Sequence, residues 1–271
     1  MIQKIPSSVP FMKMHGLGND FVMIDARDGD LRITDATVIA MADRHRGIGF
    51  DQLTIMTKHD DTDVHLTFYN ADGSTAGACG NATRCVARYI MDETEKSDLT
   101  LSTGRGILLA HDVGDGMTSI NMGQPQLTWQ EIPLAQDVDL DALPIDGAPM
   151  ATGMGNPHCT FFVEDAEGID VATLGVLFEH HSLYPERTNV QFAHVVGPDH
   201  LRMRVWERGV GLTLASGSSS CATAVAAHRK GLTGRKVRID LDGGTIYIDW
   251  RYDGVWMTGP TAHVFSGLWH G

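Results

Sequence analysis

Cysteine, basic residues and long apolar runs are all scarce in this 271-residue chain. Its four cysteines are too few for a disulfide scaffold, and their spacing fits no zinc site. The 21 Lys and Arg residues against 34 Asp and Glu give a net charge of −13, which argues against nucleic-acid and anionic membrane surfaces as partners. No apolar run approaches the ~20 residues of a membrane span, and the first residues lack the apolar core of a secretion signal. We therefore expect a reduced, cytoplasmic protein.

Cofactor motifs are also missing, although glycine is abundant at 30 residues. Gly47-Ile48-Gly49 is not continued into a dinucleotide-binding pattern, and there is no P-loop or nucleophile elbow. The histidines, such as His180 and His181, do not have metal-ligand spacing with carboxylates. The sequence thus implies neither a cofactor nor a metal, and the glycines indicate many tight turns.

The chain repeats itself with an offset of about half its length. Gly16–Asn19 recurs 137 residues later as Gly153–Asn156, and Ala78–Gly80 recurs at the same offset as Ala215–Gly217. The same offset relates further polar positions, namely Gln52 with Asn189 and Asn70 with Glu207. Chance matching of glycine-rich segments is the alternative, but the offset holds over most of the chain. We expect two similar halves related by a pseudo-two-fold axis, with the boundary in the proline-containing segment 124–152.

Each half combines short strands with one long helix. Helical spacing of apolar residues predicts helices over 81–91 and 219–230. Alternating or short apolar runs bounded by turn residues predict strands at 21–24, 53–56, 64–69, 99–102, 106–110, 117–122, 160–163, 201–206, 237–241, 245–251 and 255–258. Asp115-Gly116 is a hairpin signal. Many strands around one helix per half favour an α/β fold of the α+β type, with a mostly antiparallel β-structure wrapped around each helix.

Cys79 is the first candidate for chemistry because it directly precedes a predicted helix. Free N–H groups and the helix dipole stabilise an anion there, so a thiolate could serve as a base or nucleophile. The alternative is a buried cysteine that packs as a small hydrophobe. Cys85 and Cys221 lie within the predicted helices and Cys159 enters a strand, so we expect these three to be packing residues.

The repeat places Ser216 at the position equivalent to Cys79. Two helix N-termini could then supply N–H groups to an anion such as a substrate carboxylate, although Ser216 also suits a plain N-cap role.

Further polar side chains lie in glycine-flanked turns. Singly, each asparagine is more often a turn residue, and Arg208 could hold a carboxylate or lie in solvent. Together they predict a ligand pocket: Asn19, Gln52, Asn70, Asn81, Asn156, Asn189, Glu207 and Arg208.

Several ordered motifs closely resemble those of diaminopimelate epimerase. They are Lys13–Phe21, Gly49–Gln52, Asn70–Ser74, Cys79–Asn81, Gly155–His158, Arg187–Val190 and Trp206–Gly209. The resemblance runs from about Phe11 to Gly267. It implies two domains, residues 1–123 plus the tail 263–271 and residues 124–262. It also implies a homodimer that interconverts L,L- and meso-diaminopimelate without a cofactor, on the route to lysine and peptidoglycan.

The resemblance also implies roles for individual residues. In the family, two cysteines on opposite faces of the substrate α-carbon remove and deliver a proton. Cys79 matches one of them, and His158 and Glu207 match residues that lie near the pair. The implied substrate contacts are Asn19, Gln52, Asn70, Gly80, Asn81, Asn156, Asn189, Glu207, Arg208, Gly217 and Ser218.

Ser216 departs from the family, which has its second catalytic cysteine at this position. A hydroxyl is a far weaker acid than a thiol, whose pKa is about 8.5, so we expect strongly reduced epimerisation. Two origins are open, an engineered Cys-to-Ser substitution and a natural variant. Three other functions are also open. They are a one-base dehydratase or racemase-like enzyme similar to the proline racemase group, a non-catalytic amino-acid-binding paralogue, and a thiol hydrolase using Cys79 and His158.

Overall fold

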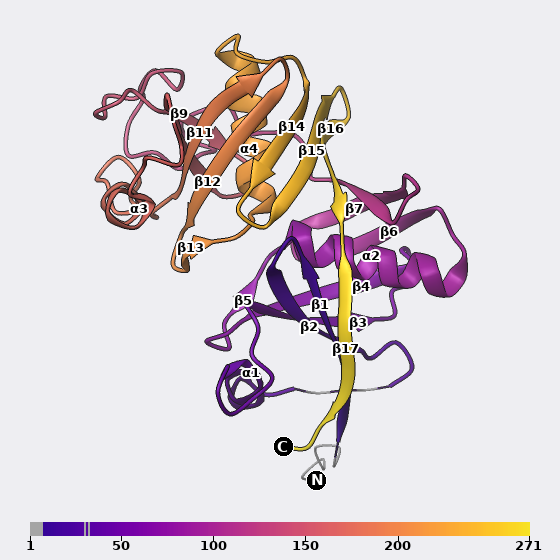
Figure 1. The fold of residues 1–271 in the computed structure, drawn as a ribbon. Helices are drawn as coiled ribbons and strands as arrows, with labels where there is room; N and C mark the ends of the chain where they lie inside the picture. Colours follow the sequence, from indigo (N-terminus) through magenta and orange to yellow (C-terminus); the bar gives the residue numbers. More distant parts are fainter. Residues whose placement is uncertain (1–7, 30, 32) are drawn as a thin grey trace. The chain divides into compact units, whose positions relative to one another are not determined.

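The computed structural model describes residues 8–29, 31 and 33–271, which form two compact units (Figure 1). Unit 1 runs to Ile120 and also contains Pro260–Gly271, while unit 2 is Asn121–Gly259. The proline-containing segment 124–152 belongs to unit 2, where Ile132, Leu143 and Ile145 are part of the core. Strands dominate both units, as the sequence predicts for a mixed α/β fold.

Unit 1 is a mostly antiparallel β-structure with two helices. Strand β2 is parallel to β3 and β4 is parallel to β6, while the other pairs are antiparallel, including that of β17 with β1. Its elements are β1 (Val9–Gly16), β2 (Asn19–Asp25), α1 (Asp35–Ala42), β3 (Gln52–Thr57), β4 (Val64–Asn70), β5 (Thr75–Ala76), α2 (Gly80–Thr94), β6 (Asp98–Thr103), β7 (Gly106–Asp112), β8 (Met117–Asn121) and β17 (Ala262–Trp269).

Apart from β17, unit 2 has the same order of strands and helices as unit 1. Strand β10 is parallel to β11 and β12 is parallel to β14, and the other pairs are antiparallel. Its elements are β9 (Met150–Gly153), β10 (Pro157–Phe162), α3 (Val171–Glu179), β11 (Asn189–Gly197), β12 (His200–Glu207), β13 (Gly211–Thr213), α4 (Gly217–Arg229), β14 (Lys236–Leu241), β15 (Gly244–Arg251) and β16 (Gly254–Pro260).

The strand register repeats along with the topology. Phe21 is paired with Gln52 between β2 and β3, and 137 residues later His158 is paired with Asn189 between β10 and β11. The repeat found in the sequence is therefore a structural repeat, which confirms the prediction of two similar halves. The predicted hairpin at Asp115-Gly116 joins β7 to β8. Both residues have positive φ, 52° and 71°, as its turn type requires.

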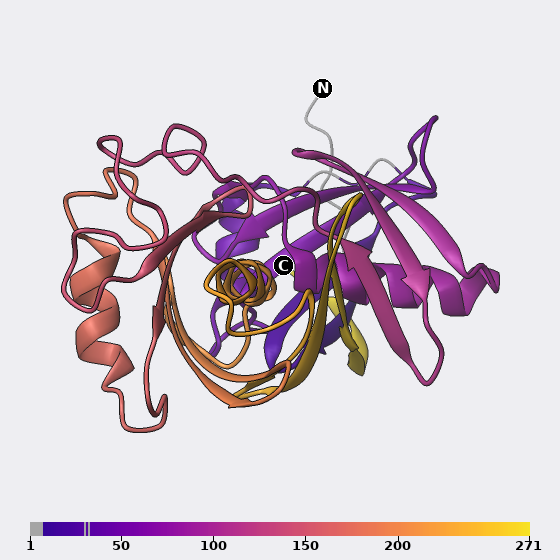
Figure 2. The same ribbon diagram turned by 90° about the horizontal axis from the view of Figure 1, so that it is seen from above.

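A buried helix lies at the centre of each unit. Strands of unit 2 curve around α4, which is seen end-on in Figure 2. Most of its residues are buried alanines, serines and other small residues, and a helix that is buried on all sides needs such a surface for the strands to approach. Helix α2 packs against β1, β6 and β7 in unit 1. Both helices begin near the predicted positions, and their N-caps are Cys79 and Ser216.

Two short helices are not predicted by apolar spacing. Helices α1 and α3 span eight and nine residues, which is too short for a clear helical period. Their N-caps are the signal that could have found them. The side chain of Thr34 accepts a hydrogen bond from the Thr37 amide, and that of Asp170 accepts one from the Thr173 amide.

Gly175→Ala is expected to destabilise the protein by about 1–3 kcal/mol through overpacking. A Cβ at Gly175 in α3 would lie 2.4 Å from Cγ of Trp206, and Trp206 cannot easily move because its indole N–H donates to Glu179. This outweighs the usual helix preference for alanine. Urea denaturation midpoints measure the effect, with Gly168→Ala as the control because its nearest contact would be an ordinary 3.5 Å. A Gly175→Ala protein as stable as the parent would contradict this packing.

Asp240 is expected to contribute to the free energy of unfolding, and this contribution should be lost in acid. Burial raises the pKa of Asp240, but hydrogen bonds from Thr245, His200 and Arg238 outweigh burial and lower the pKa to about 2. Because the unfolded value is about 3.9, this contribution is present above pH ~4 and is lost as the pH falls towards 2. The stability difference between the parent and Asp240→Asn should therefore shrink over that range in urea titrations. Asp146→Asn, at an exposed position, is the control, and a difference independent of pH would contradict the prediction.

Candidate active site

Cys79 lies at the N-cap of α2 with extended backbone angles, φ −146° and ψ 109°. The Cys79 carbonyl accepts hydrogen bonds from the amide of Thr83 at 2.9 Å and from its hydroxyl at 2.8 Å. The thiol does not cap the helix and is partly exposed. Its backbone therefore starts the helix, and its side chain lies beside the first-turn N–H groups without capping them.

Ser216 has the same local structure at the N-cap of α4. Its angles are φ −136° and ψ 120°, and its carbonyl accepts from the amide of Ser220 at 3.1 Å and from its hydroxyl at 2.8 Å. The Ser216 Oγ is buried and has no hydrogen-bond partner among the described residues. Serine at an N-cap normally accepts from the helix N–H groups, so the plain capping role considered for Ser216 does not occur here.

The polar residues of unit 1 form two hydrogen-bonded pairs at the ends of neighbouring strands and the start of α2. Gln52 donates from Nε2 to Asn70 Oδ1 at 2.9 Å, across the β3–β4 pairing. Asn81 donates from Nδ2 to Asn19 Oδ1 at 3.1 Å. Asn81 follows Gly80 in the first turn of α2, and its own Oδ1 is buried without a partner among the described residues. That oxygen is an acceptor available to a ligand donor such as an ammonium group.

Charged residues behind Asn19 fix its orientation. Asn19 Nδ2 donates to Asp51 Oδ2 at 2.7 Å, and Arg44 bridges Asp20 and Asp51 at 2.8 and 2.7 Å. Burial raises the pKa of Asp20, but hydrogen bonds and ion pairs with Arg44 and Lys13 lower it overall. Burial and the neighbouring Asp20 charge raise the pKa of Asp51. These contacts hold the Asn19 amide in position, while the Arg44 side chain remains 54% exposed.

In unit 2, Asn189 holds two segments together. Its Nδ2 donates to the Pro157 carbonyl at 3.0 Å, and its Oδ1 accepts from the Arg208 amide at 3.0 Å. Glu207 accepts from the Thr213 hydroxyl at 2.7 Å, and the Arg208 guanidinium donates to the Glu186 carbonyl at 3.0 Å. The sequence left open whether Arg208 holds a carboxylate or lies in solvent. In the structure its guanidinium contacts a backbone carbonyl instead. Gly217 and Ser218 form the first turn of α4.

Two polar residues that sequence reasoning missed support this part of unit 2. Buried Glu179 accepts from Trp206 Nε1 at 2.7 Å and from the Gly209 amide at 2.9 Å, and so holds the turn that carries Glu207 and Arg208. Gln191 is fully buried and its Nε2 lies 3.1 Å from His158 Nδ1. A polar residue inside the apolar run of β11 is the signal that could have found it.

The three remaining cysteines are buried, as expected for packing residues. Burial raises the pKa of both Cys85 and Cys159 to about 12, so neither thiol ionises near neutral pH. Cys221 lies within α4. Cys79 therefore differs from the other three cysteines in being partly exposed.

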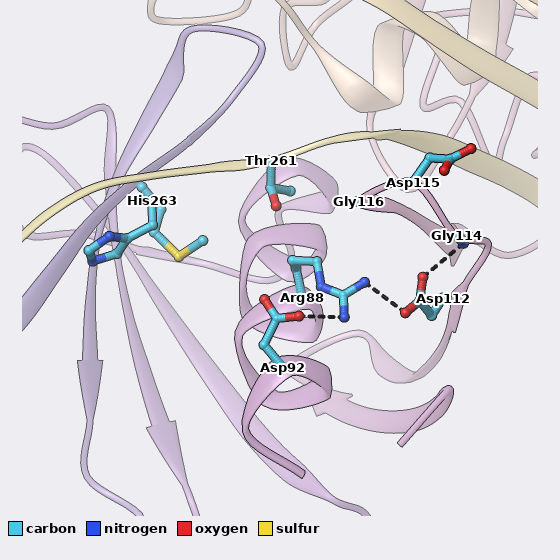
Figure 3. Close-up of a pocket in the computed structure, with 9 residues that line it drawn as sticks. Arg88, Asp92, Asp112, Gly114, Asp115, Gly116, Thr261 and His263 are labelled. Carbon is cyan, nitrogen blue, oxygen red and sulfur yellow. Dashed lines mark hydrogen bonds and ion pairs between the residues drawn. The ribbon is translucent and has the colours of Figure 1, made fainter. Parts of the chain in front are cut away.

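A depression of about 400 Å³ in unit 1 is lined by none of the predicted site residues (Figure 3). Arg88 crosses it between Asp92 and Asp112, at 2.6 and 2.9 Å, and Thr261 and His263 line it as well. Because the Arg88 charge is already held by two carboxylates, the Arg88 guanidinium is not free to bind an anionic ligand in this depression.

Across residues 8–29, 31 and 33–271, no three or more His, Cys, Asp or Glu side chains are grouped to hold a metal ion. Within that part of the chain, no helix is both long and apolar enough to span a membrane.

The sequence comparisons agree on one family. The sequence profile described as "Diaminopimelate epimerase" matches residues 11–128 and 150–264. The chain is 51% identical to a diaminopimelate epimerase of Rhodospirillum centenum, over 95% of this chain and 91% of the relative. It is 48% identical to one of Acidiphilium cryptum, over 95% of each.

The fold has matches among solved structures with low sequence identity. A phenazine biosynthesis protein of the PhzF family from Bacillus anthracis superposes with a TM-score of 0.71 at 13% identity, over 97% of this chain and 99% of that one. This likeness supports the two-unit α/β fold.

Proposed function

Because the chain belongs to the diaminopimelate epimerase family, a family of isomerases, we propose that it acts on the α-carbon of diaminopimelate. The reaction interconverts the L,L- and meso-isomers without a cofactor and supplies a precursor of lysine and peptidoglycan. The curated relatives carry the name of this activity. The observation that carries the proposal is the matched geometry of Cys79 and Ser216, each at the N-cap of the central helix of its unit.

The proposed mechanism uses one acid–base group on each face of the α-carbon. The Cys79 thiolate takes the α-proton, and the C–H electron pair moves towards the substrate carboxylate. First-turn N–H groups of α2 and α4 stabilise the negative charge that develops there. The group at position 216 delivers a proton to the opposite face and so inverts the centre. The neutral amides of Asn19, Gln52, Asn70, Asn81, Asn156 and Asn189 orient the substrate, together with Gly80, Glu207, Arg208, Gly217 and Ser218.

Ser216 makes this chain a variant with reduced epimerisation in our proposal. A hydroxyl at this position is a much weaker acid than a thiol, and each pKa unit corresponds to ~1.36 kcal/mol. The Ser216 Oγ is buried and has no partner in the part of the chain that the structure describes. This supports a Cys-to-Ser change, because a thiol tolerates that environment better than a hydroxyl does. His158 and Glu207 remain proposed neighbours that tune the acid–base pair.

We propose a cytoplasmic homodimer in which β17 contributes to the interface. Its residues Val264, Phe265 and Leu268 are 54%, 46% and 57% exposed, and exposed apolar side chains grouped on one strand mark association sites. Sedimentation analysis of the parent and of Phe265→Asp tests this assembly, and two monomeric proteins would contradict it.

The substrate is tested by incubating the protein in D2O with a panel of amino acids. The panel holds L,L- and meso-diaminopimelate, L-proline and 4-hydroxyproline, and mass spectrometry measures deuterium at the α-carbon. We expect deuterium in diaminopimelate alone, and none with Cys79→Ser. Exchange into or dehydration of hydroxyproline, with diaminopimelate untouched, would replace the proposal with a one-base enzyme. Thermal stabilisation by diaminopimelate without any exchange would replace it with a binding protein.

A further inference from the structure

We infer that Gln191 is a positioning residue that holds His158 as a neutral imidazole protonated on Nε2. Through His158 it turns the Asn156 amide so that the NH2 group faces the ligand. The part that concerns the ligand rests on the proposed function. Gln191 lies outside the set of residues implied by the family resemblance, and the inference comes from the hydrogen bonds of unit 2.

The three side chains form a continuous line from the interior of unit 2 to its surface. His158 on β10 and Gln191 on β11 are both fully buried, and Asn156 is half-buried. Gln191 Nε2 lies 3.1 Å from His158 Nδ1, and His158 Nε2 lies 2.9 Å from Asn156 Oδ1. Burial of a polar network is tolerated when its members have partners, so the orientation of each member depends on the next.

Gln191 also contacts two hydroxyl groups, and the structure presents its amide nitrogen to the His158 ring. Its Oε1 accepts from the Thr160 hydroxyl at 3.1 Å, and its Nε2 lies 3.0 Å from Ser219 Oγ. The atom that faces His158 Nδ1 is this same Nε2, at 3.1 Å. An amide nitrogen only donates, so the Nδ1 atom of His158 must accept with its lone pair.

The tautomer of His158 then determines the orientation of Asn156. With Nδ1 unprotonated, a neutral ring carries its proton on Nε2 and donates it to Asn156 Oδ1. The NH2 group at the other end of Asn156 is left as a donor for a carboxylate. Since Ser219 lies in the first turn of α4, the same glutamine also links this donor to the helix that begins after Ser216.

Nitrogen NMR of the full-length protein labelled with ¹⁵N-histidine tests the inference. The His158 signals are identified by their loss in His158→Gln. At pH 7 we expect an unprotonated Nδ1 and a protonated Nε2. A ring protonated on Nδ1, or on both nitrogens, would overturn the inference from the parent spectrum alone.

Gln191→Glu reverses the chemistry at Nδ1, because a carboxylate accepts and cannot donate. We expect the His158 proton to appear on Nδ1 in this variant, and an unchanged tautomer would overturn the inference. Gln124→Glu is the control. Its side chain donates to the Tyr252 carbonyl at an exposed position, so His158 should keep the parent tautomer.

Kinetics in the Ser216→Cys background test the step to the ligand. Gln191→Glu should raise KM for diaminopimelate about tenfold or more, because a donor to a carboxylate is lost, with a smaller change in kcat. A shifted tautomer with unchanged KM would overturn the role of Asn156. If the tautomer is as inferred but no variant acts on diaminopimelate, the proposed function fails while the positioning of His158 stands.

Discussion

Ser216→Cys is expected to raise the rate of diaminopimelate epimerisation by about 10²–10⁴-fold, the usual contribution of one positioned acid–base group. The backbone around Ser216 matches that around Cys79 in both dihedral angles and carbonyl contacts. A thiol placed there needs no rearrangement of α4. It also removes a buried hydroxyl without a partner among the described residues, which costs about 1–3 kcal/mol, so thermal stability should not fall.

Chiral chromatography of the two isomers over time measures this gain in kcat. Ser182→Cys is the control, because it adds a thiol at an exposed position outside the proposed site and should give no gain. A Ser216→Cys protein no faster than the parent would contradict the assignment of this position as the second acid–base group. An equal gain in Ser182→Cys would show that any added thiol suffices.

Cys79→Ser in the parent chain is expected to abolish exchange of the substrate α-proton, with a loss of at least about 10²–10⁴-fold. Both N-caps would then carry hydroxyl groups, and the other cysteines are buried, with the pKa of Cys85 and Cys159 raised to about 12. No thiolate would remain to take the proton. Because serine already occupies the equivalent N-cap in unit 2, we expect the variant to fold.

Deuterium incorporation measured by mass spectrometry tests the role of Cys79, and Cys221→Ala is the control. Cys221 is buried among alanines of α4, so its replacement should leave the exchange rate within about twofold. Exchange that survives in Cys79→Ser at the parent rate would remove Cys79 from the mechanism.

The repeat made the main features of the fold predictable from the sequence. It related Cys79 to Ser216 and Gln52 to Asn189, and the structure places both pairs at equivalent topological positions. The two central helices were predictable because each is long enough to show a helical period. Helices α1 and α3 were not, since eight or nine residues with a glycine inside α3 leave little periodic signal.

The residues that support the candidate site could not be predicted from the sequence, for a different reason. Gln191 contacts His158 across 33 positions of the chain and Ser219 across 28. Glu179 reaches Trp206 and Gly209 from the end of α3. Such contacts depend on how strands and helices pack, and neither periodicity nor local spacing encodes them. Only the position of Gln191 within an apolar strand marked it as unusual.

The most direct test of the two-base account is the stereochemistry of exchange in the parent chain. L,L- and meso-diaminopimelate are incubated separately in D2O, and each recovered isomer is analysed for deuterium and configuration. With one thiol and one hydroxyl, we expect that only the isomer whose α-proton faces Cys79 gains deuterium, and that it does so with retained configuration. Deuterium in both isomers with rapid inversion would contradict the proposed two-base mechanism, because it would show that Ser216 does not disable the second face.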